Sequence, residues 1–203
     1  MNLETGLIAL LIIIPSAILH EIAHGVIAER LGDPTARLRG RLTLNPIPHI
    51  DPYMTILLPL LLIIAHSPVI IGGAKPVPVD PFNLRDGRKD LALVSLAGTA
   101  TNFIIAIGFA AIIHLVPVSV LPNLVFQIFY LIVQLNLLLG IFNLVPIPPL
   151  DGSKIFSMLL PEREAASFMS IGNMGFILVL GFLYLFGGIL SNLLYFALHL
   201  LGL

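Results

Sequence analysis

Two histidines and a glutamate lie within five residues of one another in an otherwise apolar stretch, as His20-Glu21-Ile22-Ala23-His24. Residues i and i+4 share one face of a helix, so the two imidazoles can bind one divalent metal ion. Glu21 would then reach a metal-bound water as general base. The pattern predicts a metal-dependent hydrolase. The alternative is a buried polar cluster that only packs helices together.

A third ligand is expected, because catalytic zinc usually has three protein ligands and one open position. The candidate is Asp151, in the segment Asn143-Leu-Val-Pro-Ile-Pro-Pro-Leu-Asp151-Gly152, whose prolines exclude a regular helix. Irregular backbone at membrane depth persists only where it is buried in protein or lines a wet cavity. An interfacial loop in which Asp151 caps the next helix is the alternative. The nearby histidine pair favours the metal site, with one zinc ion per chain.

The composition requires that these groups be positioned inside a membrane. Of the 203 residues, 58% are hydrophobic and only 10% are charged. Ordinary soluble domains carry about 25% charged residues, so a soluble domain is excluded. The net charge of −1 gives no indication of a nucleic-acid partner. The chain is predicted to be one integral-membrane domain over residues 1–203.

Four stretches are long and apolar enough to cross a bilayer, which takes about 20 residues. They are residues 6–28, 91–116, 124–145 and 171–203. The last would be about 50 Å long as one helix, so we expect a break at Gly187-Gly188 and a second, short helix after it. The core is then residues 6–160, with a helical C-terminal extension over residues 161–203.

The segments between the crossings are predicted to be only partly helical. Residues 53–71 are apolar, but Pro59 lies in their middle. Residues 75–79 alternate with proline and must be extended, and the alternation of Arg37, Arg39 and Arg41 indicates one face of a strand. The expected fold is therefore an all-α polytopic membrane protein with three transmembrane helices around a zinc site. Short β-strands are expected in the membrane-adjacent loops.

The two halves of the site constrain the topology. His20 lies about 21 Å along its helix from Gly6, and Asp151 follows the end of the 124–145 crossing. Both reach one ion only if these two helices run parallel, so the 91–116 crossing runs the opposite way. Residues 53–71 should then form a re-entrant or interfacial hairpin bent near Pro59 rather than a crossing. This places eight of the ten positive charges on one face, which the positive-inside rule makes cytoplasmic.

The chain resembles the site-2 protease family of intramembrane zinc metalloproteases over residues 15–160. His20 to His24 match the zinc-binding helix of that family, and residues 143–152 match its Asn-x-x-Pro-x-Pro-x-x-Asp-Gly signature. Gly98 and Asn102 resemble its Gly-x-x-x-Asn helix, although Thr99 stands where many members have proline. Residues 42–46 and 73–79 resemble the small prokaryotic branch that lacks a PDZ domain.

The resemblance implies that His20, His24 and Asp151 bind zinc, that Glu21 is the base, and that Asn143 orients the substrate or binds the oxyanion. The expected activity is a zinc metalloendopeptidase in which zinc-activated water attacks a peptide carbonyl. By resemblance alone, its substrates are transmembrane segments of membrane proteins, cleaved within the lipid bilayer. The prokaryotic branch implies the plasma (inner) membrane.

Two other functions use the same residues. A transition-metal transporter would need further ligands along a pathway and no Glu21, and an inactive binding protein would not need a complete set of ligands and base. Asn102 could equally make an interhelical hydrogen bond. The remaining histidines have no metal partner four residues away and are expected to pack at interfaces; they are His49, His66, His114 and His199.

Overall fold

The computed structural model describes residues 3–65, 72–117 and 122–203, and all regular structure in them is helical. In chain order the elements are α1 (Leu3–Arg30), α2 (Thr35–Leu38), the 3-10 helix η1 (Ile47–His49), the π-helix η2 (Pro52–Leu57), α3 (Leu58–Ile64), the 3-10 helix η3 (Pro81–Asn83), α4 (Gly87–Leu115), α5 (Asn123–Asn143), α6 (Asp151–Ser157), α7 (Glu162–Ser170), the 3-10 helix η4 (Ile171–Met174) and α8 (Gly175–Leu200).

Four of these helices are long and apolar enough to cross a membrane, over Glu4–Arg30, Gly87–Leu115, Asn123–Asn143 and Ile177–Leu200. The predicted all-α polytopic architecture is therefore confirmed. The predicted short β-strands are not: no strand occurs among the described residues. Residues 72–80 are irregular, as their prolines require, but they do not pair as a strand within the chain.

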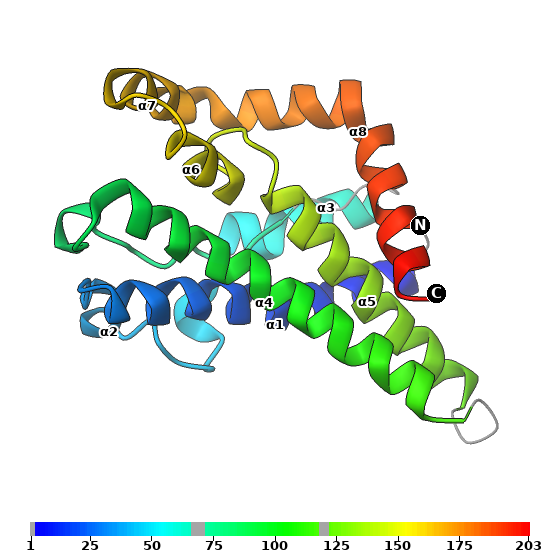
Figure 1. Ribbon diagram of the computed structural model, residues 1–203. Helices are drawn as coiled ribbons and strands as arrows, with labels where there is room; N and C mark the ends of the chain where they lie inside the picture. The colour runs from blue at the N-terminus through cyan, green and yellow to red at the C-terminus, as the bar shows by residue number, and fades with distance from the viewer. Residues whose placement is uncertain (1–2, 66–71, 118–121) are drawn as a thin grey trace.

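Three helices, α1, α4 and α5, form the core around the predicted site. α4 packs against both of the others. In Figure 1, α1 and α5 run in the same direction and α4 runs the opposite way, as the two halves of the site required. Small side chains let α4 approach its neighbours closely. The buried residues of its central stretch are Ala92, Val94, Ser95, Gly98, Thr99, Asn102 and Ala106.

The segment predicted to re-enter the membrane begins with a helix over Pro52–Ile64, which is shorter than a crossing requires. Residues 66–71, including His66, lie outside the described part of the chain. The two ends of the segment meet. The amide of Gly73 donates to the carbonyl of Met54 at 3.2 Å. The hydroxyl of Thr55 donates to the carbonyl of Gly73 at 2.6 Å. Residues 54–55, at the start of the segment, thus lie beside residue 73, at its end. This supports a segment that re-enters the membrane over one that crosses it.

The end of α1 is joined to the loop before α4 by Asp33, which is fully buried. Its carboxylate accepts the amide of Asp80 at 2.7 Å and the side-chain amide of Asn83 at 3.0 Å. It also accepts the amide of Thr35 at 3.0 Å. Burial alone would raise the pKa of Asp33, but these hydrogen bonds together hold that pKa below its ordinary value.

The three alternating arginines do not form one face of a strand, and that prediction is wrong. Residues 35–38 form the short helix α2, where Arg37 pairs with Glu29. Arg37 and Arg39 are exposed, whereas Arg41 is buried and donates to the carbonyl of Lys75 at 2.5 Å. The three arginines do not share a face because the chain turns as a helix at residues 35–38, where successive side chains are rotated by about 100° and not by the 180° of a strand.

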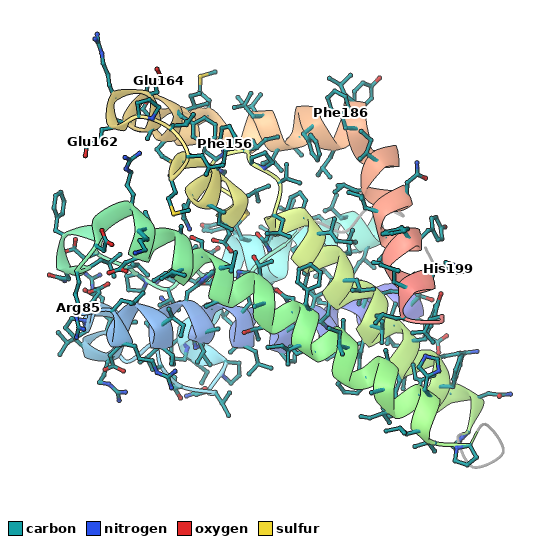
Figure 2. All side chains as sticks on the ribbon, in the orientation of Figure 1. Arg85, Phe156, Glu162, Glu164, Phe186 and His199 are labelled. Atoms are coloured by element: carbon teal, nitrogen blue, oxygen red, sulfur yellow. The ribbon has the colours of Figure 1, made fainter. Side chains whose placement is uncertain are left out.

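The C-terminal extension contains α7, η4 and α8. α8 is hydrogen-bonded as one helix of 26 residues, so the expected interruption at Gly187-Gly188 is wrong. Figure 1 shows instead that α8 changes direction sharply, and Figure 2 labels Phe186 at this bend. Adjacent glycines are a recognised cause of kinks in a continuous helix. After the bend, Leu198 packs with Val133 and Leu137 of α5 in the apolar core.

Candidate metal centre

The two histidines of α1 lie on one face of that helix and are both buried, each with 7% of its surface exposed. Their Nε2 atoms are 2.9 Å apart. Spacing of four residues on a helix brings the rings together, and the packing of α4 against α1 removes them from solvent.

Hydrogen bonds on the far side of each ring determine which nitrogen carries the proton. His24 Nδ1 lies 2.7 Å from the carbonyl oxygen of Val94, which can only accept, so Nδ1 is the donor. His20 Nδ1 lies 2.7 Å from Oδ1 of Asn102. The Asn102 amide nitrogen is turned to Oδ1 of Asn136 at 3.1 Å, so Oδ1 is the acceptor for His20. Both Nε2 atoms therefore present lone pairs to each other.

Asp151, the first residue of α6, completes the cluster. Its Oδ2 lies 3.1 Å from His20 Nε2 and 3.1 Å from His24 Nε2. Its Oδ1 accepts from Lys154 Nζ at 3.0 Å, one turn later in α6. Oδ2 is buried and has no hydrogen-bond donor among the described residues. The structure thus brings together three sequence-predicted residues from two distant segments.

Three acceptor atoms facing one another require a cation. With both imidazoles neutral, as metal ligands are, neither Nε2 carries a proton, and the three lone pairs repel one another unless a cation lies between them. Two neutral imidazoles and a carboxylate are a donor set that zinc binds. Tetrahedral zinc sets neighbouring ligand atoms roughly 3.3–3.6 Å apart, within a few tenths of an ångström of the separations here. The residues present therefore fit zinc.

Glycines make the approach of these segments possible. A Cβ on Gly98 of α4 would lie 2.4 Å from His24 Cε1 and 2.8 Å from His20 Cε1. A Cβ on Gly152 would lie 2.1 Å from the carbonyl oxygen of Leu144, so the loop before α6 can fold back only with glycine after the aspartate. α6 is also fixed to α4, because Arg88 donates to the carbonyls of Ser157 at 3.0 Å and Leu160 at 2.8 Å.

Glu21 lies beside the pair on α1. One ligand atom of each of His20, Glu21 and His24 lies within 4.8 Å of the others. The Oε2 atom of Glu21 accepts a hydrogen bond from the amide of Val77 at 2.6 Å, so the irregular 72–80 segment lies beside this glutamate. A small cavity of about 160 Å³ opens here, and its polar lining comes from His20, Glu21, Asn102 and Asn143.

Asn143, the last residue of α5, makes its hydrogen bond within its own helix. Its Nδ2 donates to the carbonyl of Leu139 in its own helix at 3.0 Å. It lines the cavity and does not contact the cluster of histidines and aspartate. Its second amide hydrogen remains available to a group bound in that cavity.

Asn102, for which an interhelical hydrogen bond was one of the two expectations, makes one to Asn136 of α5; Asn136 and Ser16, which extend this line of buried polar residues, went unnoticed in the sequence. Asn136 of α5 accepts a hydrogen bond from the side-chain amide of Asn102 at 3.1 Å. Its own side-chain amide donates to Oγ of Ser16 on α1 at 3.0 Å. These side chains link α1, α4 and α5 through the membrane-spanning core. The available signal was an uncharged polar residue in an apolar helix, because each such residue needs a buried partner.

The other histidines divide into two kinds. His199 and His114 lie at the C-terminal end of α8 and of α4, and His114 contacts the carbonyl of Leu201 at 2.6 Å. His49 is fully buried, and its carbonyl accepts the amide of Lys75 at 2.8 Å, which fixes it to the 72–75 segment.

Comparisons with known proteins agree with this geometry. The family described as "Peptidase family M50" matches residues 119–186. The chain is 40% identical over 174 residues to the "Putative zinc metalloprotease YwhC" of Bacillus subtilis (strain 168), covering 83% of this chain and 76% of that protein.

It is 33% identical over 159 residues to the "Putative zinc metalloprotease Rip2" of Mycolicibacterium smegmatis. That match covers 74% of this chain but only 57% of Rip2. No solved structure matches the chain. A relative of this similarity, matched over most of both chains, establishes the family. The chain belongs to Peptidase family M50, the site-2 protease family of zinc metalloproteases.

Proposed function

We propose that this zinc metalloprotease is an endopeptidase that cleaves transmembrane segments of membrane proteins within the bilayer. One observation carries the proposal: the lone pairs of His20, His24 and Asp151 converge, and His20 and Glu21 line a cavity between helices that are long enough to cross a membrane. Buried ionisable groups in such helices are costly and are retained for function.

His20, His24 and Asp151 are the residues proposed to hold the metal, one ion per chain. Zinc bound by them supplies a Lewis acid that polarises a peptide carbonyl and lowers the pKa of water toward 7. Asn102 and the carbonyl of Val94 fix the ring orientations, and Lys154 leaves Oδ2 of Asp151 as the atom that faces the rings. Such outer partners orient ligands and tune their basicity.

Glu21 is proposed as the general base. Its Oε1 has no hydrogen-bond partner among the described residues, while Oε2 is held by the amide of Val77. The carboxylate accepts a proton from the attacking water and passes it to the leaving amine, as the hydroxyl adds to the carbonyl carbon and the C–N bond breaks. The amide of Asn143, which lines the cavity, is proposed to orient the substrate carbonyl or to donate to its oxyanion.

The substrate must be unwound at the cleavage site, because a helix hides its carbonyls in hydrogen bonds. The irregular segment offers an edge for it. The backbone groups of Gly73, Lys75 and Val77 are hydrogen-bonded to other parts of the chain, at residues 54–55, 49 and 21. Backbone groups alternate in an extended chain, so Ala74 points the other way, and it has no backbone partner among the described residues. A substrate strand can pair there by strand addition.

The proposed location is the plasma membrane of a bacterium, with the basic loops in the cytoplasm. The zinc metalloproteases that the chain matches are bacterial. A transport function would need further ligands along a pathway. In the described part of the chain, such groups gather at one place, where Asp151 joins His20, Glu21 and His24. The enzyme is therefore favoured over the transporter.

The test uses the full chain in detergent with a panel of transmembrane peptides, with and without a chelator. Glu21→Gln keeps size and polarity but removes the base, so zinc content should stay near one per chain while cleavage falls by about 10²–10⁴-fold or more. His20→Ala with His24→Ala should abolish tight zinc binding. Glu162→Gln and His199→Ala are matched controls at exposed positions of α7 and α8.

Wild-type cleavage by Glu21→Gln would refute the assigned base. Full zinc content in the double histidine variant would refute the metal site. If Glu21→Gln also carried zinc across liposomes at the wild-type rate, the transporter would replace the protease.

A further inference from the structure

The backbone that carries Asp151 is fixed, but the orientation of its carboxylate is not fixed by the backbone. Asp151 begins α6, and a Cβ on the next residue, Gly152, would lie 2.1 Å from the carbonyl oxygen of Leu144. The far end of α6 is tied to α4, because Arg88 donates to two carbonyls there. The last torsion of an aspartate is broad and roughly two-fold. The partners of the two carboxylate oxygens must therefore set how the group is turned.

These two oxygens have different partners. Oδ2 of Asp151 lies 3.1 Å from Nε2 of His20 and 3.1 Å from Nε2 of His24, and it has no donor among the described residues. Oδ1 accepts from Nζ of Lys154 at 3.0 Å, and in the described part of the chain this ammonium group is its one donor. The carboxylate thus turns one oxygen to the metal site and the other to a positive charge.

The choice of a charged donor at this position needs a reason. Two hydroxyls lie close by in α6 but bond elsewhere: Ser153 donates to the carbonyl of Leu150 at 2.6 Å, and Ser157 donates to the carbonyl of Lys154 at 2.7 Å. An ammonium group beside a bound dication is repelled by it, so lysine here has an electrostatic cost. A hydrogen bond between charged groups is roughly twice as strong as a neutral one. Such a donor can hold Oδ1 against the attraction of the metal.

We propose that Lys154 is a positioning residue that limits Asp151 to one ligand oxygen and so keeps one coordination position of the metal open. Catalytic zinc has three protein ligands and one position for water. Two imidazoles and a single oxygen leave that position free, whereas two oxygens from Asp151 would fill it. Without Lys154, the buried Oδ1 loses its donor and turns to the metal instead. The proposal rests on the proposed metal site, but it does not rest on the proposed proteolysis.

Substitutions at Lys154 separate this role from ordinary support of a ligand. Lys154→Met keeps an apolar stem and removes the ammonium group, so the metal gains an oxygen and loses a repelling charge. Its metal affinity should not fall, but a small ligand should bind the metal less well. Ordinary support predicts the opposite, because loss of an outer partner typically costs about 10–100-fold in metal affinity. Lys154→Arg keeps a charged donor and should match the parent. Lys154→Gln offers a weaker, neutral donor and should lie between them.

The experiment uses the full chain in detergent, loaded with cobalt(II), whose visible absorption changes with its ligands. All variants carry Glu21→Gln, so that Glu21 neither repels an anion nor competes for the open position. Sodium azide is the probe of that position. Lys154→Met should bind azide about 10–100-fold more weakly than the parent, the scale expected for loss of an outer partner. Cobalt affinity is measured by competition with a chelator. Lys89→Met is the matched control, because Lys89 pairs with Asp86 at the same spacing of three residues and both are exposed.

Each outcome has a distinct meaning once thermal unfolding has shown that the variants fold. Weaker azide binding with undiminished cobalt affinity in Lys154→Met, restored by arginine, supports the proposal. Equal azide affinity in Lys154→Met and the parent overturns it, and so does a fall in cobalt affinity. A parent that binds cobalt but no azide has no open position, which overturns it as well. A parent that binds no cobalt refutes the metal site together with the proposal. A failure of the proteolysis shows separately, as absent cleavage by the chain that keeps Glu21 while cobalt and azide bind as expected.

Discussion

The helices α4 and α8 are similar in length and both are apolar enough to cross a membrane, yet they do different things. Within their most apolar windows, 33% of α4 is buried against 11% of α8. α4 buries Ser95, Thr99 and Asn102, and its buried glycine faces the histidine pair. In α8 the polar residues are exposed, and the buried side chains, such as Leu190 and Leu198, are apolar. Figure 2 shows His199 labelled beside the C-terminal turns of α8.

The difference teaches where the functional information lies in such a chain. Apolar composition decides only that a helix can lie in the bilayer, and by this measure α4 and α8 are equivalent. What distinguishes α4 is a face of small and polar residues that must be matched by a neighbour. The comparison therefore predicts that changes on this face of α4 remove activity and that matched changes on α8 do not.

The largest effect is expected at Gly98. An alanine methyl there would lie 2.4 Å from His24 Cε1 and 2.5 Å from His24 Nε2, so either the imidazoles or the helices must move. A displacement of about 1 Å can cost about 10²-fold in rate, so Gly98→Ala should lose at least that much cleavage and most of its zinc. The measurements are zinc content and initial cleavage rate.

Two glycines provide the matched controls for this substitution. A Cβ would meet nothing within 4 Å at Gly108 of α4 or at Gly181 of α8. Alanine at these positions should keep full activity, and helix propensity should slightly favour folding. Full zinc content and activity in Gly98→Ala would show that α4 tolerates added side-chain atoms as well as α8 does, which would contradict the comparison of these two helices.

A smaller loss is expected when Asn102 is replaced by leucine. The substitution removes the acceptor that holds His20 Nδ1 and the donor to Asn136, while preserving an apolar helix. Loss of such an outer partner typically costs 10–100-fold in metal affinity or activity, so zinc affinity should fall by about that factor. Asn192→Leu, at an exposed position of α8, is the matched control and should leave zinc affinity unchanged. Equal affinity in both variants would reduce Asn102 to a packing residue.

The sequence could predict which side chains would meet because each half of the cluster is a local pattern. His20 and His24 are four residues apart, and the proline-rich loop before Asp151 must be irregular wherever the chain goes. The need for both halves to reach one ion then gave the parallel directions of α1 and α5. These inferences use short-range geometry plus one constraint, and the structure brings the three side chains together as they require.

The partners of the site could not be predicted in the same way. Asn102 and Asn136 are 34 residues apart, and Asn136 and Ser16 are 120 residues apart. Nothing local specifies such pairs, because they depend on how three helices pack. His49 was missed for the same reason: its burial comes from the 72–75 segment, and no feature of its own neighbours in the sequence indicates that contact. The bend in α8 was half anticipated, since Gly187-Gly188 predicts a weak point but not whether the helix continues.

Asp33 tests whether burial of a polar group is by itself a sign of function. It is buried as completely as Asn102, but its partners Thr35, Asp80 and Asn83 belong to loops outside the membrane-spanning helices. We therefore expect Asp33→Asn to lower stability while leaving the cleavage rate at pH 7 and moderate temperature unchanged. Asp86→Asn, at an exposed position of the same loop region, is the matched control.

The sign of the pH dependence follows from the lowered pKa of Asp33. Its hydrogen bonds to the ionised carboxylate stabilise the folded state at every pH above the unfolded pKa of about 3.9, and this stability is lost as the pH falls through the lower folded value. Hydrogen bonds to a charged group are worth about 1.5–3 kcal/mol, so Asp33→Asn should lower the unfolding midpoint at pH 7 by about 4–8 °C. The gap between wild type and variant should narrow as the pH is lowered below about 4. Thermal unfolding in detergent from pH 3 to pH 8 measures this difference in unfolding midpoint.

A difference that is independent of pH would show that the charge of the Asp33 carboxylate contributes nothing to stability. A loss of cleavage at pH 7 without a loss of stability would show that the loops at the end of α1 belong to the active site, and the contrast between α4 and α8 would no longer locate the site on its own.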